Sequence, residues 1–233
     1  MNLYIVTGTR RGLGEALAKR IAGDKDNELI ALSRPEVDLA DSASLARAFD
    51  AIEARIKGRG YAKAVLINNA GIVEPVVPLD RADPADIERN LVVNLVAPMV
   101  LMRRFIAATA HVPLRRVINI SSGAGRRAIY GWSAYCAAKA GLDMATRVVA
   151  LEAQGRGMPL EAVSLAPGVI DTGMQNVVRG ASAENFADVE RFRQMKAEGQ
   201  LRPADDVAED ILRAEREGRL KGDAVLDLRT LAW

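Results

Sequence analysis

The chain has 233 residues, 49% hydrophobic and 27% charged, which is enough for one large α/β domain with a packed core. Its formal net charge of +2 is too small to indicate a nucleic-acid or membrane partner. A single cysteine, Cys136, excludes an internal disulfide, and a single histidine, His111, excludes a histidine-rich metal site. We find no uninterrupted apolar run of about 18 residues and no basic segment before the first strand. We therefore expect no transmembrane helix, no signal peptide, no metal site and a cytoplasmic location.

Short apolar runs alternate with longer helical patterns along the whole chain. The pattern predicts strands at Leu3–Val6, Glu28–Leu32, Ala64–Ile67, Arg116–Ile120, Ala162–Leu165 and Ala224–Leu228. It predicts helices at Gly12–Gly23, Ser42–Lys57, Pro84–Thr109, Ser133–Gln154 and Ala204–Glu217. Several strands are apolar on both faces, as in a parallel sheet covered by helices. We expect one α/β domain over residues 1–233, a Rossmann-type doubly wound sheet of about seven strands with helices on both faces.

The first strand runs directly into a glycine-rich turn. Glycines at Gly8, Gly12 and Gly14 let the backbone turn sharply and approach a ligand closely. The next helix then presents free N–H groups to a pyrophosphate. The turn therefore predicts a dinucleotide site that also includes Arg10, Arg11 and Leu13.

The second strand ends without an acidic residue at Leu32, Ser33 or Arg34. An acidic residue near this point would bond the ribose 2′-hydroxyl of NAD, whereas an arginine accommodates the 2′-phosphate of NADP. We predict that Arg34 and Arg11 bind this phosphate, so that the cofactor is NADP(H). The alternative is that both are solvated surface arginines. Asp38 and Leu39 follow in a short extended piece that could flank the adenine.

The third strand ends in an amide-rich turn that includes Asn69, Ala70 and Gly71. Ligands bind outside the carboxyl ends of strands in open α/β sheets, so we expect these residues at the cofactor. Asn94 lies within an apolar stretch of the helix Pro84–Thr109, where a buried amide needs a partner. It could also be simply a satisfied core asparagine.

A tyrosine and a lysine, Tyr135 and Lys139, lie four residues apart on a predicted helix and therefore on one face of it. A phenol titrates near pH 10, and a nearby ammonium would lower that pKa toward a useful range. Ser122 lies thirteen residues before the tyrosine, after the fourth strand. The pair alone could be a surface lysine and a packing tyrosine on an ordinary helix.

Together these motifs resemble the short-chain dehydrogenase/reductase family over nearly the whole chain. The resemblance rests on the turn from Thr7 to Gly14, on the amide turn at residues 68–71, and on Asn94, Ser122, Tyr135, Lys139 and Pro167-Gly168, in that order and spacing. Residues 120–176 are similar to the sepiapterin reductase and benzil reductase branch. Sepiapterin reductases carry an acidic residue near the C-terminus that holds the pterin, and Asp227 falls too early for that role.

The resemblance implies a hydride transfer between a nicotinamide and a small-molecule carbonyl substrate. Ser122 would donate a hydrogen bond to the carbonyl oxygen, and Tyr135 would act as general acid. Lys139 would lower the tyrosine pKa and bond the nicotinamide ribose, while Asn94 would hold a water. The nicotinamide would meet the stretch Pro167, Gly168, Val169 and Ile170, with the Thr172 hydroxyl also in reach.

Residues 173–200 turn polar and lose strand character, which favours a lid over the substrate or an ordinary surface helix pair. Trp132 and Met174, together with Ser122, are the predicted substrate contacts. The helices at residues 84–109 and 133–154 are apolar on more faces than one sheet can cover, so we expect them to form a homodimer or homotetramer.

Three functions remain open on the sequence. The first is an NADPH-dependent reductase of ketones and 1,2-diketones. The second is a 3-oxoacyl-thioester reductase, for which Arg103-Arg104 or Arg126-Arg127 could dock an acyl carrier. The third is a non-catalytic NADP-sensing scaffold, because fold alone does not settle function. A complete set of Ser122, Tyr135 and Lys139 favours an enzyme.

Overall fold

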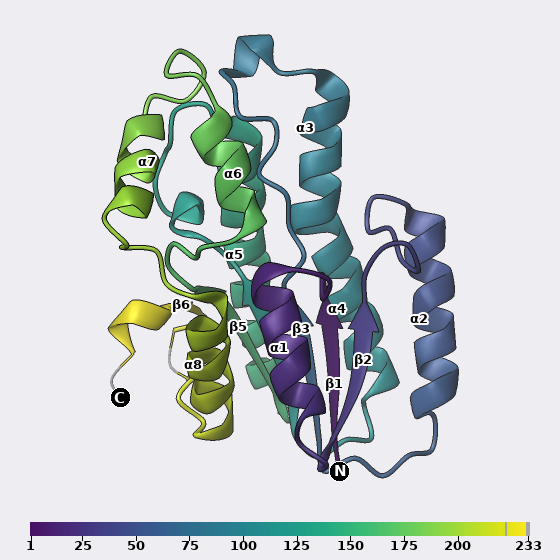
Figure 1. The fold of residues 1–233 in the computed structure, drawn as a ribbon. Helices are drawn as coiled ribbons and strands as arrows, with labels where there is room; N and C mark the ends of the chain where they lie inside the picture. The colour runs from purple at the N-terminus through teal and green to yellow at the C-terminus, as the bar shows by residue number, and fades with distance from the viewer. Residues whose placement is uncertain (222, 232–233) are drawn as a thin grey trace.

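A six-stranded parallel sheet forms the centre of the molecule (Figure 1). The computed structural model describes residues 1–221 and 223–231. The strands are β1 Asn2–Thr7, β2 Asn27–Leu32, β3 Lys63–Asn68, β4 Arg115–Ile120, β5 Leu160–Ala166 and β6 Val225–Asp227. They lie in the order β2-β1-β3-β4-β5-β6. The chain therefore reverses direction across the sheet after β2, which is the switch point where such sheets bind ligands.

Helices cover both faces of the sheet, as predicted. They are α1 Gly12–Ala22, α2 Ser42–Ile56, α3 Pro84–Leu91, α4 Ala97–Ala108, α5 Ser133–Gly155, α6 Gly173–Gly180, α7 Val189–Ala197 and α8 Ala204–Arg216. Figure 1 shows α1 and α8 on the face toward the viewer, with α6 and α7 above the carboxyl edge of the sheet. The five predicted helices and all six predicted strands therefore occur close to their expected places, with α3 and α4 together forming the stretch predicted at Pro84–Thr109.

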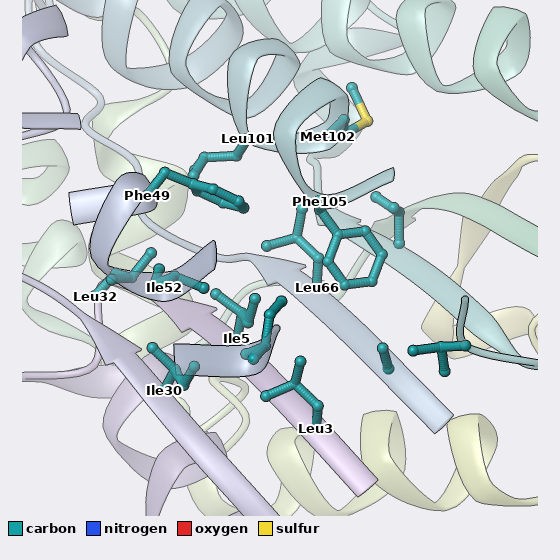
Figure 2. Close-up of a cluster of buried hydrophobic side chains, with 14 of the residues drawn as sticks. Leu3, Ile5, Ile30, Leu32, Phe49, Ile52, Leu66, Leu101, Met102 and Phe105 are labelled. Atoms are coloured by element: carbon teal, nitrogen blue, oxygen red, sulfur yellow. The ribbon is translucent and has the colours of Figure 1, made fainter. Parts of the chain in front are cut away.

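Alternation along each strand divides the hydrophobic core in two. In β1, Leu3 and Ile5 point to one face and Tyr4 and Val6 to the other. The first face packs against α2 and α4, and Figure 2 shows Phe49, Leu101 and Phe105 meeting these strand residues. The second face packs against α1 and α8. Because both faces are buried, the strands are apolar on both sides.

The described residues form six strands, one fewer than the approximate count of seven, and these are the six that the pattern predicts. The loop after β2, which contains Asp38 and Leu39, lies outside the sheet, and its backbone groups bond locally. The Val37 N–H donates to the Ser33 carbonyl oxygen, and the Asp38 N–H donates to Ser44 Oγ at 3.1 Å. The loop after β2 is thus held as turns against the core rather than as an edge strand.

The helical stretch Pro84–Ala108 contains one irregular turn. A π-helical segment, Val92–Val96, joins α3 to α4 and contains the buried Asn94. The stretch has 25 residues, and an 18-residue window within it has a mean hydropathy of 1.7. By length and composition alone it could therefore cross a membrane, contrary to our expectation. Core helices pass the same test, and here Leu101, Met102 and Phe105 are buried against the sheet.

Candidate functional site

A cavity of about 970 Å³ opens at the carboxyl ends of the strands. It brings together nearly all of the predicted site residues from segments far apart in the chain. These are Gly8, Arg10, Arg11, Gly12, Leu13, Gly14, Arg34, Asp38, Leu39, Asn69, Ala70, Gly71, Ser122, Trp132, Tyr135, Lys139, Pro167, Gly168, Val169, Ile170, Thr172 and Met174. Asn94 alone among the predicted residues does not line it.

The glycine turn forms one wall of the cavity and is packed so closely that side chains are excluded. Gly8 and Gly12 have φ angles of +73° and +58°, which favour glycine. A Cβ on Gly14 would lie 2.1 Å from the Gly8 carbonyl oxygen and 2.4 Å from Asn69 Nδ2. Asn69 Nδ2 in turn donates to the Thr7 carbonyl oxygen at 2.9 Å. The bare backbone and the N-terminus of α1 therefore face the cavity together, as a bound pyrophosphate requires.

Thr7, which the sequence indicates only as the first residue of the glycine-rich turn, connects two turns of the cavity. Its Oγ1 accepts hydrogen bonds from the N–H groups of Asn69 and Ala70, both at 3.0 Å. The turn after β1 and the turn after β3 are therefore fixed to each other. This cradle fits a dinucleotide in shape and in hydrogen-bonding character.

Three arginines line the side of the cavity that is formed by the loops after β1 and β2. Arg10 Nη1 donates to the Arg34 carbonyl oxygen at 2.9 Å, which connects the two loops. Arg10, Arg11 and Arg34 are exposed, and none has a carboxylate within 4 Å in the part of the chain that the structure describes. Their guanidinium groups are therefore free to bind an anionic ligand.

Ser122 and Tyr135 meet inside the cavity, where the tyrosine is buried. Burial raises the pKa of Tyr135 to about 12, and a hydrogen bond with Ser122 acts in the opposite direction. Loss of solvent dominates this shift, and the expectation that Lys139 lowers the pKa of the phenol stays a prediction. The phenol therefore stays protonated at neutral pH and is ready to donate its proton.

Lys139 is buried beside the tyrosine, with Nζ 5.7 Å from the centre of its ring. Its Nζ donates to the Ile120 carbonyl oxygen at 2.9 Å. Burial lowers the pKa of Lys139 to about 8, and the Asp143 carboxylate partly opposes this. Asp143 Oδ1 accepts from Ser121 Oγ and Ser164 Oγ, each at 2.5 Å. A buried carboxylate, which the sequence did not single out, thus influences the ammonium.

Asn94 lies behind the cavity and shapes its wall. Its Oδ1 accepts from the Ile72 N–H at 3.2 Å, and its Nδ2 donates to the Ile72 carbonyl oxygen at 2.8 Å. A Cβ on Gly71 would lie 2.8 Å from Asn94 Oδ1. π-helical turns often occur at functional sites, and this one places the amide under the Gly71 turn. The water that the resemblance implies stays a prediction.

The far end of the cavity is aromatic. Trp132 stacks on Phe186 with ring centres 4.9 Å apart, and it lies 5.4 Å from the ring of Tyr135 in an edge-on arrangement. Phe192 of α7 also contacts Trp132 and lines the cavity. Residues 173–200 therefore form the helices α6 and α7 around this end, and their movement as a lid stays a prediction.

The C-terminal segment also reaches the cavity, which the sequence did not reveal. Asp227, at the end of β6, lines it together with Arg229. Arg229 Nε and Nη2 donate to the two carboxylate oxygens of Asp227 at 2.9 and 2.6 Å. This pair holds the pKa of the Asp227 carboxyl below its usual range. Asp227 is thus within the cavity, but its carboxylate is engaged by an arginine.

Comparisons with known proteins agree with this arrangement. A family model described as short chain dehydrogenase matches residues 32–182. A benzil reductase ((S)-benzoin forming) of Bacillus subtilis (strain 168) is 37% identical, and the match covers 95% of this chain and 96% of that protein. A sepiapterin reductase of Meriones unguiculatus is 29% identical over 96% of this chain and 94% of its own. A solved short-chain dehydrogenase/reductase from Saccharomyces cerevisiae shares the fold, with a TM-score of 0.83 at 21% identity over 98% of this chain and 96% of its own.

Proposed function

This chain belongs to the short-chain dehydrogenase family and is an oxidoreductase, and on that premise we propose that it is an NADPH-dependent carbonyl reductase of ketones and 1,2-diketones. The observation that carries the proposal is the meeting of Ser122, Tyr135 and Lys139 in the same cavity as the glycine cradle. A scaffold that only sensed the cofactor would not need this set of residues.

The chemistry follows from where these side chains lie. When bound, the reduced nicotinamide supplies a hydride to the carbonyl carbon. Ser122 donates a hydrogen bond to the carbonyl oxygen, which gains negative charge as the π bond breaks. Tyr135 gives that oxygen its proton, so the carbonyl compound becomes an alcohol and the cofactor is oxidised by two electrons. Protonated Lys139 beside the phenol stabilises the tyrosinate that remains.

Two observations support NADP(H) as the cofactor. Arg11 and Arg34 are exposed at the cavity and lack carboxylate partners in the described residues. No carboxylate occupies the end of β2, where one would bind the ribose hydroxyls of NAD. Two planar cations without a nearby acid favour a ligand that carries the extra phosphate.

The aromatic end of the cavity supports a bulky apolar substrate. Trp132 and Phe192 provide ring faces beside the tyrosine, and Ile129 and Val178 extend the apolar surface. Aromatic side chains bind other rings by offset stacking and edge-on contact. Two similar proteins are named benzil reductases, and benzil carries two such rings.

We test this proposal with NADPH oxidation at 340 nm over benzil, sepiapterin, 3-oxoacyl thioesters and simple ketones. The proposal expects the largest kcat/KM for benzil, with an alcohol product that matches the NADPH consumed. A larger value for 3-oxoacyl thioesters would replace the proposed substrate class. If the protein binds NADPH but oxidises none of it in the presence of these carbonyl compounds, it would instead be a sensing scaffold.

We also propose that the chain forms a homodimer or homotetramer through the helices at residues 84–109 and 133–154. Val96 at the end of the π-helical segment is exposed, as are Met99 and Val100 of α4. Met144, Val148 and Leu151 along α5 are exposed as well. An apolar patch of this kind on two neighbouring helices indicates a protein interface. Sedimentation at micromolar concentration should give twice the chain mass or more, and a stable monomer would contradict this interface.

A further inference from the structure

Three neighbouring strands bring a charged pair to the reaction centre. Ile120 of β4 lies opposite Leu165 of β5, and Ala166 of β5 lies opposite Asp227 of β6. Ser122, Gly168 and Arg229 each follow the carboxyl end of one of these strands. The C-terminal pair therefore lies at the end of a strand two places along the sheet from the strand that leads to the catalytic serine.

Arg229 extends from the edge of the sheet toward that centre. A Cβ added to Gly168 would lie 3.3 Å from Arg229 Cδ and 3.8 Å from Arg229 Nε. The arginine therefore covers the turn after β5, the strand that pairs with β4. It lines the same cavity as Tyr135 and Trp132.

Asp227 fixes this arginine but leaves part of it unused. The carboxylate accepts from Nε and Nη2 of Arg229 and also from its backbone N–H. A guanidinium carries five N–H groups, so the Nη1 pair and one N–H of Nη2 remain for a ligand. The Arg229 side chain is 60% exposed although it lies against the cavity wall. A carboxylate could therefore dock on a guanidinium that is already oriented.

Other charges at this end of the cavity have the same sign. Arg126 and Arg127 line it from the loop after β4, and Arg191 lines it from α7. Within the described residues, Arg126 and Arg127 have no carboxylate within 4 Å, while Arg191 has only Asp188 at 3.9 Å. Among the described residues that line the cavity, the acidic ones are Asp38, which lies beside the β2 loop, and the already engaged Asp227. The substrate end is therefore net positive beside an aromatic wall.

We propose that the substrate is an anionic carbonyl compound, a 2-oxo or 3-oxo acid with an aromatic or bulky apolar group, and that Arg229 recognises its carboxylate. This inference rests on the proposed reductase function and narrows its substrate class. The apolar group lies against Trp132 and Phe192, the carbonyl oxygen faces Ser122 and Tyr135, and the carboxylate faces Arg229. Asp227 acts as a positioning residue that holds the guanidinium in place.

The test compares two substrates that differ in one charge. Benzoylformate is a 2-oxo acid with a phenyl ring, and methyl benzoylformate is its neutral ester. The wild-type protein should show a kcat/KM for the acid at least tenfold above that for the ester, mainly through a lower KM. In Arg229→Gln the value for the acid should fall on the order of ten- to a hundredfold, as expected for loss of a charge-assisted hydrogen bond. The value for the ester should change by less than about threefold.

Matched variants separate recognition from structural effects. Arg156→Gln removes an exposed arginine at the end of α5, outside the cavity. It should leave kcat/KM unchanged for both the acid and the ester. Asp227→Asn keeps Arg229 but weakens its anchor, so the KM for the acid should rise while the KM for the ester stays constant. Arg229→Lys should recover part of the preference for the acid, because it restores the charge without the planar fork.

Several results would overturn the inference. It fails if the wild type has the higher kcat/KM for the ester. It also fails if Arg229→Gln lowers kcat/KM for the acid and the ester by the same factor. It also fails if that variant chiefly raises the KM for NADPH, because Arg229 would then serve the cofactor. If benzil and the ester are reduced but kcat/KM for the acid is no higher than for the ester, this inference is wrong and the proposed function still holds. Absence of NADPH oxidation with all three compounds removes the proposed function itself.

Discussion

Replacing Gly14 by alanine tests the cofactor cradle through a clash that the structure defines. The added Cβ would lie 2.1 Å from the Gly8 carbonyl oxygen. Gly8 and the first turn of α1 must therefore separate by about 0.9 Å to reach the 3.0 Å limit of real contacts. Overpacking of this kind costs about 1–3 kcal/mol. Displacement of Asn69 Nδ2 from the Thr7 carbonyl oxygen adds about 1 kcal/mol.

Alanine also stabilises a helix relative to glycine by about 0.5–1 kcal/mol, which offsets part of this loss. The expected net change is a loss of about 1–3 kcal/mol of unfolding free energy, or about 2–12 °C in Tm for a domain of this size. Because the turn that meets the pyrophosphate moves, the Kd for NADPH should rise at least about tenfold.

The assay is a fluorescence titration with NADPH beside a thermal melt of the same variant. Gly23→Ala at the end of α1 is the matched control, since its Cβ would meet only carbonyl oxygens at 3.4 and 3.5 Å. That control should bind NADPH like the wild type and melt at the same temperature or slightly higher. A Gly14→Ala protein that binds NADPH with wild-type affinity would refute the assignment of this turn as the cradle.

Further predictions concern specificity, pH and assembly. Arg34→Asp should shift the ratio of kcat/KM for NADPH over NADH at least about tenfold toward NADH, and an unchanged ratio would remove Arg34 from the phosphate site. The pKa of Lys139 is lowered to about 8, so the ammonium is lost and kcat should fall as the pH rises through that value. Asp143 raises the pKa of Lys139, so Asp143→Asn should move this fall to lower pH; a rate profile that does not move would contradict the coupling. Val148→Glu on the exposed face of α5 should give monomers in sedimentation, whereas an intact oligomer would place the interface elsewhere.

The parts of the fold that repeat a strong local pattern were predictable from the sequence. Buried parallel strands such as β1 and β3 are continuous apolar runs, and the glycine turn follows β1 directly. Motif spacing also placed Ser122, Tyr135 and Lys139 together. The local turns of the loop after β2 have no comparable signature in the sequence: there the Val37 N–H bonds to Ser33 and the Asp38 N–H bonds to Ser44.

Features that depend on tertiary contacts could not be predicted. In the π-helical turn, the Asn94 amide bonds to Ile72, which lies in a separate loop. Arg229 reaches the cavity only because β6 pairs with β5, about sixty residues earlier in the chain. The upward shift of the Tyr135 pKa could not be predicted for a similar reason, because spacing along a helix shows a neighbouring charge but not how deeply both groups are buried.

The central claim is that Tyr135 delivers the proton to a reduced carbonyl. Tyr135→Phe keeps the ring that packs on Trp132 and removes only the hydroxyl. The variant should bind NADPH with a Kd within about threefold of the wild type and lose at least about a thousandfold in kcat for benzil. A variant that binds NADPH normally and still reduces benzil at more than about a tenth of the wild-type rate would contradict the account.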